Sequence, residues 1–85
     1  MTQLAITETV LRRRLGSNVR ALRTAAPFTL KQAAVRATMH WRHWQKIEAG
    51  QTNLTLFTLS RIADALNVEP GELLLEPPLR SRKPN

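Results

Sequence analysis

Every strong apolar pattern in the chain repeats at the spacing of an α-helix, and this feature restricts the fold most. Between Leu11 and Ala26, apolar residues recur every three or four positions, which places them on one face of a helix. Other stripes with the same spacing follow, and no segment of useful length alternates in the manner of a strand. The sequence therefore predicts an all-α fold.

The first helix has a clear start and a clear stop. Thr7 is expected to cap its start. Pro27 is expected to end it, because the proline ring pushes Ala26 out of helical geometry. Gly16 weakens the middle, so the residues before it are expected to form a separate or frayed turn. Residues 1–13 are therefore set apart as an N-terminal extension.

Two short helices with a turn between them are expected next. Thr29 and Gln32 have the spacing of a capping box, which opens the second helix. The apolar pattern falters at Thr38, about two turns later. A third helix is expected from about His40 to residue 49, and Gly50 follows in the C′ position that favours glycine. Two helices joined in this way form a helix-turn-helix.

A fourth and a fifth helix complete the expected fold. Thr55 caps the fourth helix, and Asn67 ends it. Its apolar stripe consists of Leu56, Leu59, Ile62, Ala63 and Leu66. Pro70 opens the short fifth helix at the first position, where proline is permitted. The prediction is a compact five-helix domain over residues 14–76, followed by a disordered basic tail over residues 77–85.

Length and composition exclude several classes of protein. The chain of 85 residues is expected to hold one small domain, which needs close helix packing or a partner subunit for stability. It has no cysteine, so a disulfide framework and a thiolate metal site are excluded. No apolar run approaches the roughly 20 residues that span a bilayer, and the N-terminus does not resemble a secretory signal. A cytoplasmic location is therefore expected.

The formal net charge of +7 is distributed unevenly. Residues 1–46 contain nine basic residues and one acid, whereas residues 47–76 contain one basic residue and five acids. A folded chain of this order is expected to have one basic side, and nucleic acid is the polyanion that such a side most often binds. A charged surface that is merely solvated remains the ordinary alternative.

The expected third helix has two different sides. Trp44 and Ile47 fall on one side and are expected to face the core. The other side carries long hydrogen-bonding side chains and no acid, namely Arg42, Gln45 and Lys46. In the major groove of DNA, arginine can bind guanine, glutamine can bind adenine, and lysine can reach guanine or a phosphate. A solvated face is the plainer interpretation of any one residue, but the set favours DNA binding.

Residues 15–75 resemble the Cro/C1-type (XRE) helix-turn-helix family. The resemblance rests on an ordered set of segments, which are residues 19–23, 29–50, 56–68 and 70–74. It implies a lambda-repressor-like DNA-binding domain that binds double-stranded DNA and regulates transcription as a repressor. It also implies a homodimer on an inverted repeat, with half-sites about one helical turn apart. No cofactor and no metal are implied.

The resemblance also assigns roles to individual residues. The base contacts fall on Trp41, Arg42, Gln45 and Lys46. The phosphate contacts fall on Thr29, Lys31, Gln32, His40, His43, Thr52 and Asn53. Arg23 and Glu48 are expected to form a structural ion pair between the first and third helices. The candidates for the dimer contact are Val68, Glu69 and Leu75.

Three positions depart from the family pattern. Leu30 stands where a phosphate-binding glutamine is usual, so Lys31 or Gln32 would have to replace that contact. Thr38 stands where the turn usually has glycine, which predicts a strained or differently shaped turn. Trp41 stands at a position that is usually polar. It would either stack on a thymine methyl or sugar, or pack on the flank of the domain.

The sequence is also compatible with functions other than that of a sequence-specific DNA-binding regulator. An antitoxin would bind a toxin protein with the fourth and fifth helices or with the tail, and would still bind its own promoter. A sequence-neutral DNA-binding protein would need only the basic face. His40 and His43 are three residues apart on a helix, but no other metal ligand lies near them, so zinc is disfavoured. No catalytic constellation is present, and we expect no enzyme. Residues 1–13 could serve as a DNA-binding arm, an extra helical turn or a dimer contact.

Overall fold

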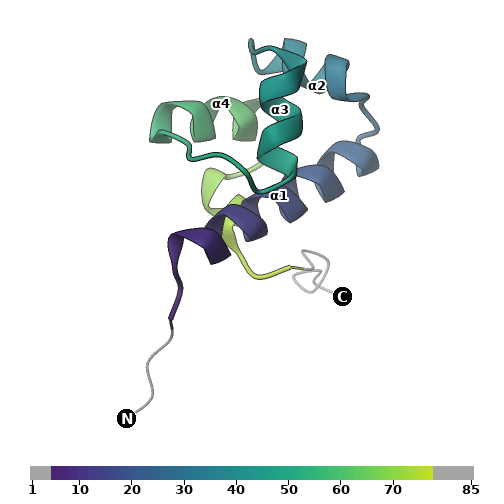
Figure 1. Cartoon of the computed structure of the whole chain (residues 1–85). Helices are drawn as coiled ribbons and strands as arrows, with labels where there is room; N and C mark the ends of the chain where they lie inside the picture. Colours follow the sequence, from purple (N-terminus) through teal and green to yellow (C-terminus); the bar gives the residue numbers. More distant parts are fainter. Residues whose placement is uncertain (1–4, 78–85) are drawn as a thin grey trace, which may run out of the picture.

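The structure is a computed structural model that describes residues 5–77. It consists of α1 (Glu8–Ala25), α2 (Leu30–Arg36), α3 (Trp41–Glu48), α4 (Leu56–Leu66) and the 3₁₀ helix η1 (Pro70–Leu74). In Figure 1, α3 stands across α1, with α2 and α4 on its two sides. The described residues contain no strand, so the all-α prediction is confirmed.

The number of α-helices differs from the prediction. The segment expected as a fifth helix is a 3₁₀ helix that ends at Leu74, and Leu75 is already extended. The buried Asn18 of α1 explains this ending. Its amide nitrogen donates to the carbonyl oxygens of Leu73 at 2.9 Å and Leu75 at 2.8 Å. These carbonyls are therefore satisfied across the fold and do not need a further helical turn.

The first helix is continuous, so the expected break near Gly16 is wrong. Thr7 caps its start as expected, with its hydroxyl accepting from the Val10 N–H at 3.2 Å. A Cβ atom at Gly16 would lie 2.6 Å from the carbonyl oxygen of Ile47. Glycine at this position therefore lets the C-terminal end of α3 pack directly on α1. Residues 8–13, which were set apart as an extension, form the first turns of α1.

The end of α1 also differs from the prediction. Ala26 keeps right-handed helical dihedral angles (φ −59°, ψ −38°), and its N–H donates to the carbonyl oxygens of Leu22 and Arg23. The expectation that Ala26 leaves helical geometry is therefore wrong, and the direction of the chain changes at Pro27. The Ala26–Pro27 peptide bond is cis.

Three helices end on a residue in the left-handed region, and the residue differs each time. Gly50 follows α3 with φ 72°, and Asn67 ends α4 with φ 59°. Thr38 follows α2 with φ 57°, although it carries a β-branched side chain. Its N–H donates to the Val35 carbonyl at 3.0 Å, and the next N–H, that of Met39, donates back to α2. The turn between α2 and α3 is thus the strained one that the sequence predicted.

The core lies where the four α-helices and η1 meet. It contains the buried apolar residues Leu15, Val19, Ala33, Ala34, Ala37, Trp44, Ile47, Leu59, Ile62, Ala63, Ala65 and Leu73. Leu56 was expected on this apolar stripe but is 82% exposed. Leu54, in the loop before α4, packs against that end of the core instead. The basic tail predicted from residue 77 lies outside the described residues, except for Pro77.

Candidate nucleic-acid interface

A buried polar network fixes α3 on α1. Arg23 of α1 donates from Nε and Nη2 to the carboxylate of Glu48, the last residue of α3. The same carboxylate accepts from Trp44 Nε1 at 2.7 Å. Arg23 also donates from Nη1 to the carbonyl oxygen of Phe28 at 2.8 Å, so it connects both helices to the chain entering α2. The network holds α3 at a fixed position relative to α1 and α2.

The charge of Arg23 is stabilised by this arrangement. The hydrogen bond to Glu48 raises the pKa of the Arg23 guanidinium above its ordinary value, and the negative charge of Glu48 acts in the same direction. Partial burial opposes both effects. Arg23 and Glu48 therefore form a mostly buried ion pair, in which the two opposite charges cancel.

The outward side of α3 carries polar and cationic side chains. Arg42, Gln45 and Lys46 are all exposed, whereas Trp44 and Ile47 are fully buried. The one acid of α3 is the residue that is turned back toward Arg23. The structure thus gives α3 the two different sides that the helical periodicity predicted, with no carboxylate on the exposed one.

The start of α3 is built around Trp41. His40 caps the helix, because its Nδ1 accepts from the Arg42 N–H at 3.0 Å. The His40 and Trp41 rings stack with centroids 5.8 Å apart. Lys31 Nζ and Arg42 Cζ lie 5.8 Å and 5.5 Å from the centroid of the Trp41 ring. Trp41 is half-buried against the core, so it packs on the flank of the domain while its ring lies among cationic side chains.

The start of α2 contributes three of the predicted phosphate-binding residues. Thr29 and Gln32 form the expected capping box, in which each side chain accepts from the other residue's N–H, at 3.0 Å and 2.9 Å. These oxygens are therefore occupied within the chain, whereas the Lys31 ammonium is exposed. Lys31 lies beside Trp41, so the structure brings α2 and α3 together at this end of the interface.

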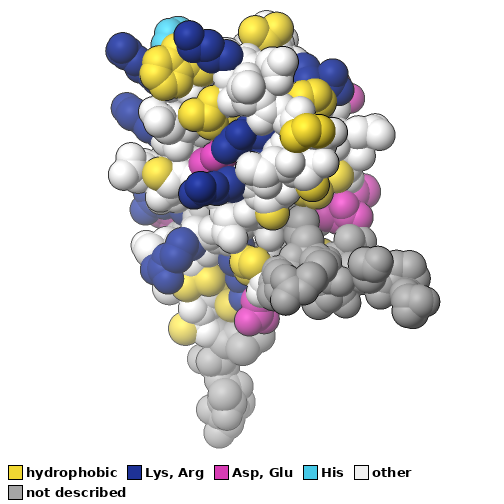
Figure 2. Space-filling model, turned by 90° about the vertical axis from the view of Figure 1, so that its right-hand side faces the viewer, with side chains coloured by type: hydrophobic (Ala, Val, Ile, Leu, Met, Phe, Trp, Pro, Cys, Tyr) yellow, Lys and Arg dark blue, Asp and Glu magenta, His cyan; other side chains and the backbone are white. Residues whose placement is uncertain are grey.

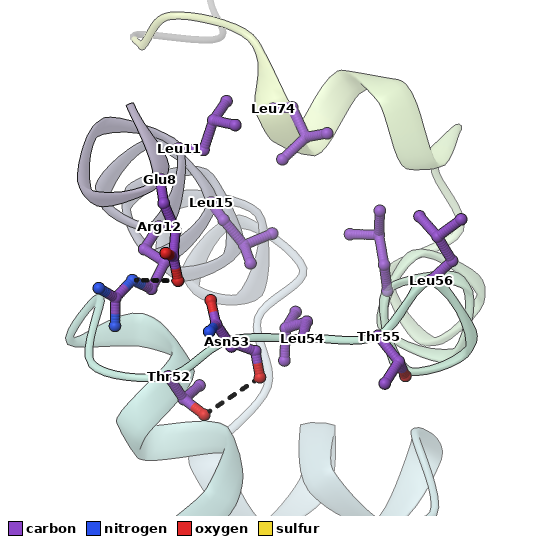
Figure 3. Close-up of a pocket in the computed structure, with 11 residues that line it drawn as sticks. Glu8, Leu11, Arg12, Leu15, Thr52, Asn53, Leu54, Thr55, Leu56 and Leu74 are labelled. Carbon is purple, nitrogen blue, oxygen red and sulfur yellow. Dashed lines mark hydrogen bonds and ion pairs between the residues drawn. The ribbon is translucent and has the colours of Figure 1, made fainter. Parts of the chain in front are cut away.

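The remaining phosphate candidates are separated. His43 is half-buried on α3. Thr52 and Asn53 follow the C-terminal end of α3, far from His40 along the helix. Figure 3 shows both beside α1, at a groove whose interior is lined by leucine side chains. The Thr52 hydroxyl donates to the carbonyl oxygen of Asn53 at 3.4 Å.

The candidates for a dimer contact lie around η1. Val68 is half-buried and packs against the core. The Glu69 carboxylate accepts from the Gly71 N–H at 3.3 Å and caps η1. Leu75 is 41% exposed. Of the three, Leu75 therefore offers the most free apolar surface.

Several residues that support the site were missed from the sequence. Asn18 was not singled out, although a polar residue three positions after Leu15 falls close to the apolar face of α1. Arg36 donates to the Ala65 carbonyl at 2.9 Å, and Arg61 donates to the Thr38 carbonyl at 3.1 Å. These arginines connect α2 and its turn to α4. No spacing rule predicts such contacts, because they join residues far apart in the chain.

The basic side expected from the charge pattern is visible on the molecular surface. Figure 2 shows Lys and Arg side chains over the left-hand side and the centre of that view, whereas the largest acidic group lies at the right-hand edge. Among residues 5–77, no group of three or more His, Cys, Asp or Glu side chains could hold a metal ion. None of the helices in this part of the chain is both long and apolar enough to cross a membrane.

Comparison with known proteins agrees with this architecture. A sequence profile described as a helix-turn-helix domain matches residues 14–76. The chain belongs to the helix-turn-helix family of DNA-binding transcription regulators. The helix-turn-helix domain that the resemblance implied is therefore confirmed. No curated protein sequence matches the chain.

Three solved structures illustrate the similarity. The restriction-modification controller protein C.AhdI from Aeromonas hydrophila is 31% identical, and the match covers 73% of this chain and 94% of that one with a TM-score of 0.70. A hypothetical transcription factor, NHTF, from Neisseria is 26% identical, covering 91% of this chain and 87% of that one with a TM-score of 0.77. A regulator from Vibrio cholerae, 19% identical with a TM-score of 0.74, shares the fold.

Proposed function

We propose that this protein is a sequence-specific regulator of transcription that binds double-stranded DNA with α3 in the major groove and acts as a repressor. The observation that carries the proposal is the exposed, acid-free side of α3, formed by Arg42, Gln45 and Lys46. This side lies on the second helix of a helix-turn-helix, and the buried Arg23–Glu48 pair holds that helix in place.

The dimensions of α3 suit the groove. Its eight residues correspond to a length of about 12 Å, and a helix with side chains is about 10–12 Å in diameter. The major groove of B-DNA is about 12 Å wide. The whole exposed side of α3 can therefore contact base edges in one groove without a large deformation of the DNA.

Each exposed residue of α3 has a proposed role. Arg42 binds O6 and N7 of a guanine, Gln45 binds N6 and N7 of an adenine, and Lys46 binds a guanine or a phosphate. Trp41 is only half-buried on the flank of the domain, and the exposed part of its ring contacts a thymine methyl group or sugar at the edge of the site. Lys31 contributes a phosphate contact beside Trp41, where its ammonium is exposed.

The remaining assignments complete the proposal. The phosphate contacts include His40, His43, Thr52 and Asn53, and backbone N–H groups at helix ends supplement them. The protein acts in the cytoplasm as a homodimer on an inverted repeat, with Leu75 in the dimer contact because it is exposed beside η1. The protein has no enzymatic activity and needs no cofactor.

Selection from a randomised pool of duplex DNA at near-physiological salt tests this function. Sequencing of the bound duplexes is expected to show an enriched inverted repeat, which would also supply the operator. If the folded protein enriches no sequence, specific regulation is contradicted. Binding that depends steeply on salt but not on sequence would then indicate a sequence-neutral DNA-binding protein.

An antitoxin is the second candidate function. The observation that favours it is the apolar surface at the start of α4, where Leu56 is 82% and Phe57 is 66% exposed. A toxin protein that packed on Leu56 and Phe57 would remove this apolar surface from water. Expression beside the neighbouring genes, followed by purification, would show a stable complex with one small toxin if the candidate is correct, and no bound protein if it is wrong.

A further inference from the structure

The exposed side of α1 carries cationic side chains that the proposed base contacts do not use. Arg13, Ser17 and Arg20 recur at spacings of four and three, so they lie on one exposed face of α1. In the described part of the chain, neither Arg13 nor Arg20 forms a hydrogen bond or an ion pair. Arg23, one turn beyond Arg20, is by contrast neutralised by Glu48. Arg13 and Arg20 therefore carry uncompensated charges.

Two shallow hollows place these arginines beside α3. Arg20 lines the first hollow together with Gln45, on the exposed side of α3, and Ala49, the residue that follows α3. Arg13 and Arg20 line the second hollow with Gly50, at the C-terminal end of α3. The arginine row thus borders α3 from its middle to its C-terminal end.

Arg13 and Arg20 lie beside the end of α3 where the chain that follows the helix supplies no cationic side chain. At the start of α3, Lys31 and Arg42 supply cationic groups. Residues 49–60, which follow α3, contain neither lysine nor arginine. The next cation, Arg61, lies over the Phe57 ring and donates to the turn before α3. A phosphate backbone borders the major groove on each side, so cationic side chains at the C-terminal end of α3 would strengthen the contacts proposed for Thr52 and Asn53.

We propose that Arg13 and Arg20 bind the phosphodiester backbone of duplex DNA, on the strand that borders α3 toward its C-terminal end. The Ser17 hydroxyl, between them, is a further donor to the same strand. The inference rests on the proposed DNA-binding function and adds to it a contribution of α1 that is independent of base sequence. Arginine suits this task because its guanidinium can donate two parallel hydrogen bonds to one phosphate.

Salt-dependent binding tests the inference. The probe is a labelled mixed-sequence duplex of about two helical turns, or about 21 base pairs. The full-length protein, Arg13→Gln, Arg20→Gln and the double variant are titrated by fluorescence anisotropy between about 50 and about 200 mM salt. Arg14→Gln is the matched control, because it removes the same charge from the same helix on the side where Arg14 donates to the Leu74 carbonyl.

Each lost phosphate contact is expected to reduce the slope of log K against log salt by about 0.9. Both protomers of the proposed homodimer contact this duplex, so the double variant removes four contacts and should lose about 3.6 from the slope, while Arg14→Gln should keep the slope of the unsubstituted protein. Each single variant removes two contacts from the homodimer, so over the fourfold change of salt its affinity deficit should shrink roughly 12-fold. Circular dichroism is expected to show the same helix content for all variants, since every substituted side chain reaches the surface.

The possible failures are distinguishable. If the unsubstituted protein binds the duplex and the Arg13 and Arg20 variants keep its slope, the contribution of α1 is overturned and the proposed function stands. If Arg14→Gln changes the slope as much as either variant, net charge rather than position determines binding, and the inference is also overturned. If the unsubstituted protein binds no duplex, the proposed function fails and this inference fails with it.

Discussion

Replacing Thr38 by glycine is expected to stabilise the protein, although the change removes a side chain. Thr38 adopts φ 57° at the turn between α2 and α3. A left-handed conformation costs a residue with a Cβ atom about 1–2 kcal/mol, and glycine avoids this cost. Glycine loses more backbone entropy on folding, by about 0.5–1 kcal/mol. The net expected gain in the free energy of unfolding is about 0.5–1 kcal/mol.

The contacts of Thr38 support this calculation. The side chain is exposed, so its removal costs little packing. The carbonyl oxygen that accepts from Arg61 and the N–H that donates to the Val35 carbonyl belong to the backbone, and glycine keeps both. For a domain of this size, the gain corresponds to a rise of about 2–8 °C in the melting temperature.

Thermal and urea unfolding, followed by circular dichroism, measure this effect. Asn67→Gly is the matched control, because Asn67 has φ 59° but asparagine tolerates this region better than threonine does. The gain at position 38 should therefore exceed the gain at position 67. A melting temperature for Thr38→Gly that is unchanged or lower would show that the turn is not strained by its threonine.

Two further substitutions test how α3 is held. Gly16→Ala should lower the free energy of unfolding by about 1–3 kcal/mol, because the new Cβ atom would lie 2.6 Å from the Ile47 carbonyl oxygen. Ser17→Ala, at an exposed position of the same helix, is the control. Equal melting temperatures of the two variants would contradict the close packing of α3 on Gly16. Glu48→Gln should cost roughly 1.5–3 kcal/mol in urea unfolding, because it leaves the mostly buried Arg23 charge unpaired. The exposed Glu76→Gln serves as its charge control, and equal stability of the two variants would contradict the role of the pair.

The sequence predicted those parts of the fold that depend on neighbours in the chain. Thr7, Thr29 and Thr55 cap helices as expected, and their hydroxyls accept from N–H groups only three residues away. Gly50 and Asn67 likewise end helices through their own backbone conformation. Such signals are complete within a few residues, so a single sequence is sufficient to find them.

The features that the sequence did not predict depend on contacts between distant segments. Gly16 was interpreted as a weak point of α1, but its role follows from the approach of α3 from more than 30 positions away. η1 ends early because Asn18 satisfies carbonyl groups more than 50 residues later in the chain. Leu56 fits the helical period of α4 and is nevertheless exposed, because Leu54 packs at that end of the core.

In the candidate site, too, the sequence predicted the features that depend on one helix and missed those that depend on contacts between distant segments. Helical periodicity predicted the exposed side chains of Arg42, Gln45 and Lys46, because one short helix carries them all. It could not place Arg13 and Arg20 beside α3, because only the crossing of α1 and α3 creates that surface. The position of Trp41, with its ring among Lys31, His40 and Arg42, likewise required the packing of α2 against α3.

Recognition of base sequence by the exposed side of α3 underlies the proposed function. The most direct test compares two proteins, the unsubstituted protein and Arg42→Ala, at one salt concentration. The affinity of each is measured for the selected duplex and for duplexes in which one guanine is replaced. Arg42→Ala is expected to lose about 1–3 kcal/mol of binding free energy on the selected duplex, or roughly 5- to 150-fold in affinity, and little on the duplex whose partner guanine is already replaced. Equal losses on all duplexes would show that Arg42 contacts the backbone, and would contradict base recognition by α3.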